Sequence, residues 1–248
     1  MAAVRRKAST GSGRSRFVRI CAAAMLACAG AAQAQFVGSL ALANQNRYRG
    51  VATEDVGPVL RASAMADASF GAYAGVSGLW RTRDAALANA EAIVGWSGRL
   101  NDIPALSGID PAWGWDVAWH RTHYGESSRY DFSEGMAGLL APGWSARLWW
   151  APHYFGSDWS SLYGEVNASR DIAEHWRVFA HIGTLRYGPG NDGYRPAGRT
   201  DAMLGAAWVA DDWDLRLARD GLVAGHAFGA LASRRREAGW LLSTSVAF

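Results

Sequence analysis

Cysteine and lysine are nearly absent from this sequence of 248 residues. The two cysteines, Cys21 and Cys28, and the one lysine, Lys7, all lie within the first 34 residues. After residue 34 the chain therefore has no means of forming a disulfide, a zinc–thiolate site, an iron–sulfur cluster or a cysteine nucleophile.

Positive charge is also scarce after residue 34. Six of the 25 Lys and Arg residues lie in residues 1–34, which contain no Asp or Glu. Residues 35–248 therefore contain 19 arginines and all 22 acidic residues. Their net charge is −3, whereas that of the whole chain is +3. This balance disfavours a nucleic acid or another polyanion as a partner.

The first 34 residues have the pattern of a secretory signal peptide. A basic polar stretch, Met1–Arg19, precedes an apolar stretch, Ile20–Ala32, and Ala32-Gln33-Ala34 has the small-x-small pattern of a cleavage site. The apolar stretch is too short to span a bilayer comfortably. We expect export by the Sec route and cleavage after Ala34, which leaves residues 35–248 as one domain. A lipoprotein anchor at Cys28 is disfavoured, because the residues before it make a poor lipobox.

Residues 35–248 contain neither a long apolar run nor a sustained helical period, but apolar and polar residues alternate in stretches of about ten residues. In 112–122, Trp113, Trp115, Val117 and Trp119 share one face, and Asp116 and His120 share the other. In a soluble β-sandwich or lipocalin the apolar face would be the core. In an outer-membrane barrel the apolar face meets lipid, and small and charged residues fill the lumen.

The placement of aromatic residues favours the membrane barrel. Large aromatic side chains fall near strand ends, as expected for indole rings at the two lipid headgroup levels. One predicted rim contains Phe70, Trp96, Trp113, Trp144, Trp176, Trp208 and Trp213, and the other contains Tyr48, Trp80, Trp119, Trp150 and Tyr187.

Two further features favour the same interpretation. Short connections alternate with longer ones, as in barrels with tight periplasmic turns and long outer loops, although the connection 100–111 is long on the short-turn side. The chain also ends in Phe248 after alternating apolar residues, the pattern of a terminal strand that the barrel-assembly machinery recognises.

The sequence therefore predicts an all-β protein, an antiparallel transmembrane β-barrel of about twelve strands. Ten strands is the alternative count, because 131–140 and 200–210 alternate least clearly. The predicted strands are 37–49, 58–67, 70–81, 89–99, 112–122, 131–140, 143–152, 159–169, 175–187, 200–210, 213–220 and 237–248.

Part of the sequence resembles a known family. The stretch Leu42–Gly50, read as Leu-Ala-Asn-Gln-Asn-Arg-Tyr-Arg-Gly, is similar to the opening motif of the TorF-type outer-membrane porin family of proteobacteria. Phe70–Val76 resembles the next strand of that family, and further similarity runs through Trp115–Gly125 to the C-terminal strand. This sequence departs from the family pattern at Asn46-Arg47 and at Ala52, where serine is usual. The resemblance implies an outer-membrane location and a barrel fold, and it implies no particular solute.

No motif for catalysis or metal binding is present. The six histidines show no H-E-x-x-H or H-x-H spacing, and there is no G-x-S-x-G sequence or phosphate-binding loop. We therefore expect no enzymatic activity, no cofactor and no metal site.

The predicted strand register points a set of charged residues into the lumen. One interpretation is a mutually neutralised network that fills the interior, and the other is a channel whose charges select solutes. In this register Arg47 and Arg49 lie together on the first strand, near Arg61, with Glu91 and Glu165 as candidate partners. The candidate lumen residues are Arg47, Arg49, Arg61, Arg81, Glu91, Asp116, Glu134, Arg147, Glu165 and Arg177.

Taken together, these patterns predict an outer-membrane porin of a Gram-negative bacterium that passes small hydrophilic solutes by passive diffusion. Its expected partners are membrane lipid, small solutes and the barrel-assembly machinery, which would recognise Phe248. The alternative hypothesis is a closed structural barrel whose outer loops, such as 221–236, bind a partner. The sequence does not indicate the oligomeric state.

Overall fold

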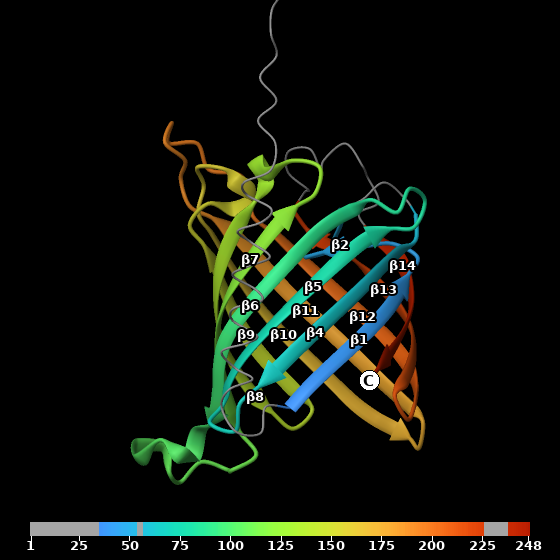
Figure 1. Ribbon diagram of the computed structural model, residues 1–248. Coiled ribbons are helices and arrows are strands. Elements are labelled where there is room, and N and C mark those ends of the chain that lie inside the picture. Colours follow the sequence, from blue (N-terminus) through green and yellow to red (C-terminus); the bar gives the residue numbers. More distant parts are fainter. Residues whose placement is uncertain (1–34, 54–56, 226–237) are drawn as a thin grey trace, which may run out of the picture.

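The computed structural model describes residues 35–53, 57–225 and 238–248, and these residues form a closed antiparallel barrel of twelve strands (Figure 1). Each wall strand pairs with the next one along the chain, and β1 closes the barrel by pairing with β14. The predicted signal peptide, residues 1–34, lies outside the described residues. The wall strands are β1 (Gln35–Ala43), β4 (Val59–Asp67), β5 (Ala72–Arg81), β6 (Leu87–Arg99), β7 (Gly114–Tyr124), β8 (Phe132–Ala141), β9 (Trp144–Ala151), β10 (Ser161–Ala173), β11 (Trp176–Tyr187), β12 (Arg199–Ala210), β13 (Trp213–Ala224) and β14 (Ala238–Ala247).

The prediction of twelve strands is confirmed, including the two that alternate least clearly, which are β8 and β12. Strands β10 and β13 each extend four residues beyond the predicted end. The predicted first strand, 37–49, is wrong in its second half, because β1 ends at Ala43 and the chain turns inward there. Residues 47–52 instead form a separate two-stranded sheet, β2 (Arg47–Tyr48) with β3 (Val51–Ala52).

The outer surface of the barrel is apolar, as the inverted pattern predicts. Val117 and Ile182 are 44% and 54% exposed, whereas the alternate residue His120 is buried. Other exposed aliphatic side chains along the wall strands are Leu42, Val94, Leu148, Val166, Leu204, Leu217 and Leu242.

The aromatic rims are largely as predicted. At one end, Phe70 contacts Trp96, Trp113 contacts Trp144, and the paired residues Trp176 and Trp208 are both exposed. At the other end, Trp119, Trp150 and Trp240 are exposed.

Tyr48 and Tyr187 do not belong to a rim, and their placement there was wrong. Tyr187 is 3% exposed inside the barrel, because it shares the parity of the inward residue His181 on β11. Tyr48 lies on the segment that turns inward.

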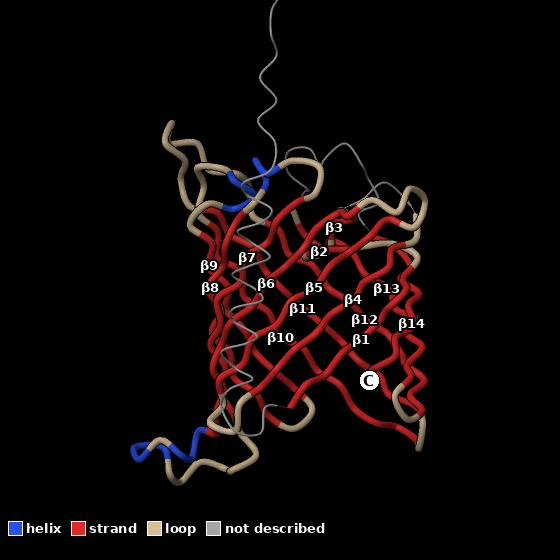
Figure 2. Tube along the Cα trace, viewed as in Figure 1, coloured by secondary structure: helices blue, strands red, loops and turns tan. Residues whose placement is uncertain are grey.

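Connection lengths differ between the two ends of the barrel (Figure 2). At one end, here called the turn end, the connections are 68–71, 142–143, 174–175 and 211–212, together with the longer excursion 100–113, which contains η1 (Leu100–Asp102) and η2 (Pro104–Leu106). At the opposite end, the loop end, the connections are longer; two of them contain η3 (Ser128–Tyr130) and η4 (Tyr154–Gly156). In the described part of the chain, no helix is long and apolar enough to span a membrane.

Candidate functional site

The barrel lumen contains a cavity of about 370 Å³. Its walls come from strands on every side of the barrel and from the segment that turns inward after β1. Polar and aromatic side chains dominate the surface. The lining residues are Asn46, Arg47, Tyr48, Arg49, Gly50, Thr53, Arg61, Asn89, Glu91, Thr122, Tyr124, Phe132, Glu134, Trp149, Tyr163, Glu165, His181, Asp201, Met203, Asp220 and Leu241.

Residues 44–53, here called the inner hairpin, fold into this lumen. Asn44 and Gln45, which directly follow β1, donate side-chain hydrogen bonds to the backbone carbonyl of Trp240 on β14. The turn between β2 and β3 places Arg49 and Gly50 at φ values of 51° and 75°. Left-handed residues such as these interrupt a β-strand. The apolar–polar alternation of the sequence continues through residue 49, but the extended backbone of the wall strand does not.

Two ion pairs fix the inner hairpin to distant parts of the wall. Nε of Arg47 lies 2.6 Å from Oδ2 of Asp220 on β13. Nη2 of Arg49 lies 2.7 Å from Oε1 of Glu134 on β8. All four side chains are more than nine-tenths buried. Charges removed from water to this extent require partners, and each arginine has a carboxylate at hydrogen-bond distance.

These partners differ from the predicted ones. We expected Arg47 and Arg49 to lie side by side near Arg61 and to be neutralised by Glu91 and Glu165. The turn at Arg49-Gly50 instead sends the two arginines to different strands. Both acidic partners, Asp220 and Glu134, lie on the inward face of the wall.

An aromatic cluster packs against the inner hairpin at the loop end. The guanidinium of Arg49 lies 4.4 to 5.4 Å from the ring centroids of Tyr48, Tyr154 and Tyr163, a cation–π arrangement. Tyr48 also donates a hydrogen bond of 2.9 Å to Glu134, and burial raises the pKa of its hydroxyl well above the usual value. The remaining rings of the cluster belong to Tyr124, Phe132, Trp149, Phe155 and Tyr187.

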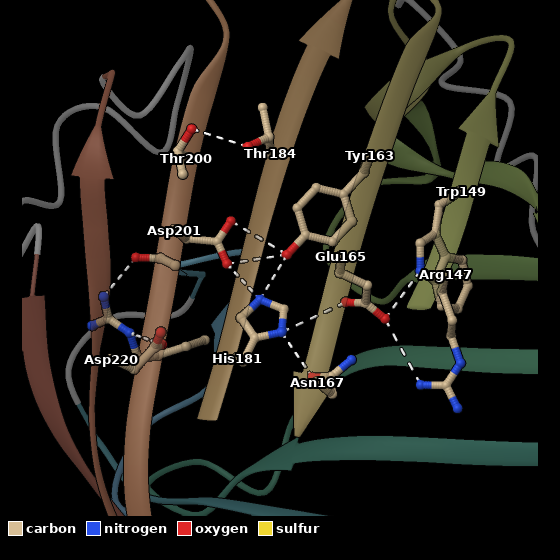
Figure 3. A network of polar contacts seen from close by, with 12 residues as sticks. Arg147, Trp149, Tyr163, Glu165, Asn167, His181, Thr184, Thr200, Asp201 and Asp220 are labelled. Carbon is tan, nitrogen blue, oxygen red and sulfur yellow. Dashed lines mark hydrogen bonds and ion pairs between the residues drawn. The ribbon is translucent and has the colours of Figure 1, made fainter. Parts of the chain in front are cut away.

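A polar network lies on strands β9 to β12 and includes Tyr163 of the aromatic cluster (Figure 3). Nε2 of His181 lies 2.9 Å from both the Tyr163 hydroxyl and Oδ1 of Asp201. Nδ1 of His181 lies 2.8 Å from the side-chain oxygen of Asn167. Glu165 accepts a hydrogen bond from Trp149 at 3.3 Å and lies 3.8 Å from Arg147. The network holds Asp201, which is 1% exposed, in a defined position.

Glycine makes this packing possible. A side chain at Gly183 would place a Cβ 2.0 Å from the Tyr163 hydroxyl oxygen, so the ring of Tyr163 lies directly over the glycine. Gly95 has the same relation to Tyr73, whose hydroxyl donates a 2.6 Å hydrogen bond to Asp116. Inward glycines thus provide the room for tyrosines that cross to neighbouring strands.

The other predicted lumen residues lie in three places. Glu91 and Arg61 line the cavity, and Glu91 lies 2.5 Å from Nδ1 of His120. Arg81 contacts Asp84 and Glu126 at the loop end. Arg177 pairs with Asp171 at the turn end, and both of these side chains are well exposed.

Some residues of the site were absent from the predicted set. Alternation assigns Tyr163 and His181 to the lumen faces of their strands, and Asp220 shares the inward parity of its strand, although none of the three was among the candidate lumen residues. Tyr154 and Phe155 lie in a connection, where no periodic signal exists, and Phe155 has a left-handed φ of 52°.

The site contains no evident metal centre. No group of three His, Cys, Asp or Glu side chains in the described ranges has the arrangement needed to hold a metal ion. The His181–Asp201–Tyr163 network has no serine, threonine or cysteine among its hydrogen-bonded members.

Sequence comparison gives no relative: no protein-family model and no curated protein matches this chain. Solved structures do match. The KdgM porin aligns over 86% of this chain and 99% of its own, with a TM-score of 0.52 and 7% identity. The NanC porin aligns over 84% of this chain and 98% of its own, with a TM-score of 0.53 and 10% identity. At such identities the likeness concerns the fold, and in fold the chain is a twelve-stranded porin-like barrel.

Proposed function

We propose that this chain is an outer-membrane porin of a Gram-negative bacterium and passes small hydrophilic solutes by passive diffusion. The observation that carries the proposal is a polar cavity inside a barrel whose outer surface is apolar between two aromatic rims. Such an exterior suits lipid, and such an interior suits water and polar solutes. The shared fold with two porins and the resemblance of Leu42–Gly50 to the TorF-type family support the same function.

The orientation follows from the connections. The short connections of the turn end would face the periplasm, and the longer loops would face outward. In this orientation both ends of the barrel chain are periplasmic, as expected for a chain exported behind the predicted signal peptide. Phe248, 77% exposed, would then be available to the barrel-assembly machinery.

Conductance in planar lipid bilayers tests the function. Residues 35–248 refolded into a bilayer should give discrete current steps. The alternative, a closed structural barrel, is favoured by the inner hairpin and the aromatic cluster, which occupy part of the lumen. A folded barrel that inserts but gives no steps would support that alternative and refute passive diffusion.

The charges of the cavity predict a weak preference for cations. Three arginines and five carboxylates line it, so the formal balance is −2 when His181 is neutral. Local carboxylates raise the concentration of cations at a narrow pore. The reversal potential in a salt gradient should therefore have the sign of a cation-selective channel. Replacing Glu91 by Gln should reduce that potential, whereas Glu126→Gln, outside the cavity lining, should leave it unchanged.

A further inference from the structure

The inner hairpin crosses the lumen instead of lying along the wall. It leaves the wall after β1, and Arg49 forms its ion pair with Glu134 on β8. In the closed ring of twelve strands, β8 is five strands from β1 in one direction and seven in the other. The Arg49–Glu134 pair therefore joins nearly opposite sides of the barrel.

The hairpin is anchored at several separate points. Arg47 pairs with Asp220 on β13, and its Nη2 also donates a 2.6 Å hydrogen bond to the carbonyl of Gly50. Gly50 itself lies against the wall, since a Cβ there would be 2.4 Å from Cβ of Asp201. These contacts fix both the base and the tip of the hairpin.

The cost of burying its charges indicates that specific contacts hold the inner hairpin inside the lumen. A polar connection at the loop end of a barrel is well solvated when it lies outside, and burying its charges carries a desolvation cost. Here two guanidiniums are buried, each with a carboxylate, and Arg49 has three tyrosine rings around it. A segment that only connected two strands would not require these partners. The wall nevertheless provides a carboxylate for each arginine of the hairpin.

We propose that the inner hairpin is the constriction of the channel and that Arg49 is the residue that fixes its width. The proposal rests on the proposed porin function. Solutes would pass between the hairpin and the cavity wall that bears Arg61 and Glu91, close to the Arg49–Glu134 pair. The hairpin thereby limits passage to small hydrophilic molecules.

The main test removes the anchor at the hairpin tip. The double variant Arg49→Ala/Glu134→Ala removes both charges together, so neither is left buried alone. The matched control is Asp171→Ala/Arg177→Ala, which removes an exposed ion pair at the turn end. Folding of each variant is checked by its shift in gel mobility on boiling. Single-channel conductance and the size of polyethylene glycol that enters the pore are then measured.

We expect the tip variant to raise the conductance by about twofold or more and to admit larger polymers, because conductance increases with the open cross-section. The control should match the wild type. A folded tip variant with wild-type conductance and wild-type size limit would overturn the constriction while leaving the porin function intact.

The other outcomes separate the two proposals. If the wild type gives no current and the tip variant conducts, passive diffusion through the native protein is refuted and the obstructing role of the hairpin stands. If neither conducts, both proposals fail.

A second measurement uses the lack of cysteine after residue 34. Arg49→Cys provides a single thiol at the hairpin tip, and Gly108→Cys provides one in the turn-end excursion, with nothing within 4 Å of the added Cβ. A bulky, charged methanethiosulfonate reagent should reduce the current through the first variant and leave the second unchanged. An unchanged current after confirmed labelling of Arg49→Cys would also overturn the proposal.

Discussion

At the scale of single residues, parity along a strand decides between lipid and lumen. On β7, Val117 is exposed outside, whereas its neighbours Asp116 and Ala118 lie on the inward face. Because consecutive side chains point to opposite faces, a shift of one position moves a residue from hydrocarbon to the polar interior.

A charge placed at the two faces of β7 should therefore have unequal effects. We expect Val117→Arg to impair assembly strongly, since an arginine facing mid-bilayer costs about 2–4 kcal/mol. Ala118→Arg should be tolerated better, because its guanidinium faces the lumen and the carboxylate of Asp116. The fraction of heat-modifiable barrel after refolding measures both. Equal yields from the two variants would contradict the assigned faces.

Residue parity also marks the limit of what the sequence predicts in the site. It places Glu91 and Glu165 on the inward faces of regular strands, and both side chains line the cavity. Alternation also points Arg47 and Arg49 inward, and both line the cavity, but it does not show that the backbone turns there and sends them to different strands. Their partners could not be predicted either, since Arg47 and Asp220 are 173 positions apart and only closure of the barrel brings them together.

At the scale of elements, the inner hairpin depends on the backbone of one glycine. Gly50 combines a φ of 75° with close contact to Asp201, so any side chain there meets both a conformational and a steric penalty.

Gly50→Ala should lower the free energy of unfolding by about 1–3 kcal/mol, the range for a residue held in a strained backbone region. Gly193→Ala is the matched control, because Gly193 has a similar φ of 78° but nothing within 4 Å of the added Cβ. The control reports backbone strain alone, and the excess for Gly50→Ala reports the contact with Asp201. Urea titration of the refolded barrel gives both values. Equal losses for the two variants would show that the hairpin tip is not held against the wall.

At the scale of the whole molecule, the apolar exterior and the aromatic rims determine where the protein can be stable. Trp119 and Trp150 flank Gly135 near the loop end, and Trp176 faces Trp208 at the turn end. Indole rings favour headgroup levels, and the exposed aliphatic residues between the rims favour hydrocarbon.

The protein should therefore fractionate with outer membranes and should change its gel mobility on boiling. Its expression with residues 1–34 present, followed by membrane separation and immunoblotting, measures the first property. A protein released into the periplasm as a soluble monomer would contradict the membrane location.

Most of this large-scale organisation could be predicted from the sequence. Alternation, connection lengths and rim aromatics identify the twelve strands. They also identify the one long connection on the turn side, which the structure places at 100–113. These signals are local and repeat around the barrel, so single irregularities do not obscure them. The filling of the lumen is different, because the inner hairpin and the Tyr154–Phe155 turn are each unique in the chain and depend on contacts with remote strands.

The Arg47–Asp220 ion pair also bears on the order in which the molecule is assembled. Arg47 follows the first wall strand, and Asp220 lies on β13, the last strand but one. The hairpin is thus among the first segments of the barrel chain to be synthesised, yet its anchor at Asp220, unlike the one at Glu134 on β8, exists only when nearly the whole wall is in place. Pairing of β14 with β1 then encloses it. The earliest connection of the barrel can consequently acquire its full set of native contacts only late in assembly.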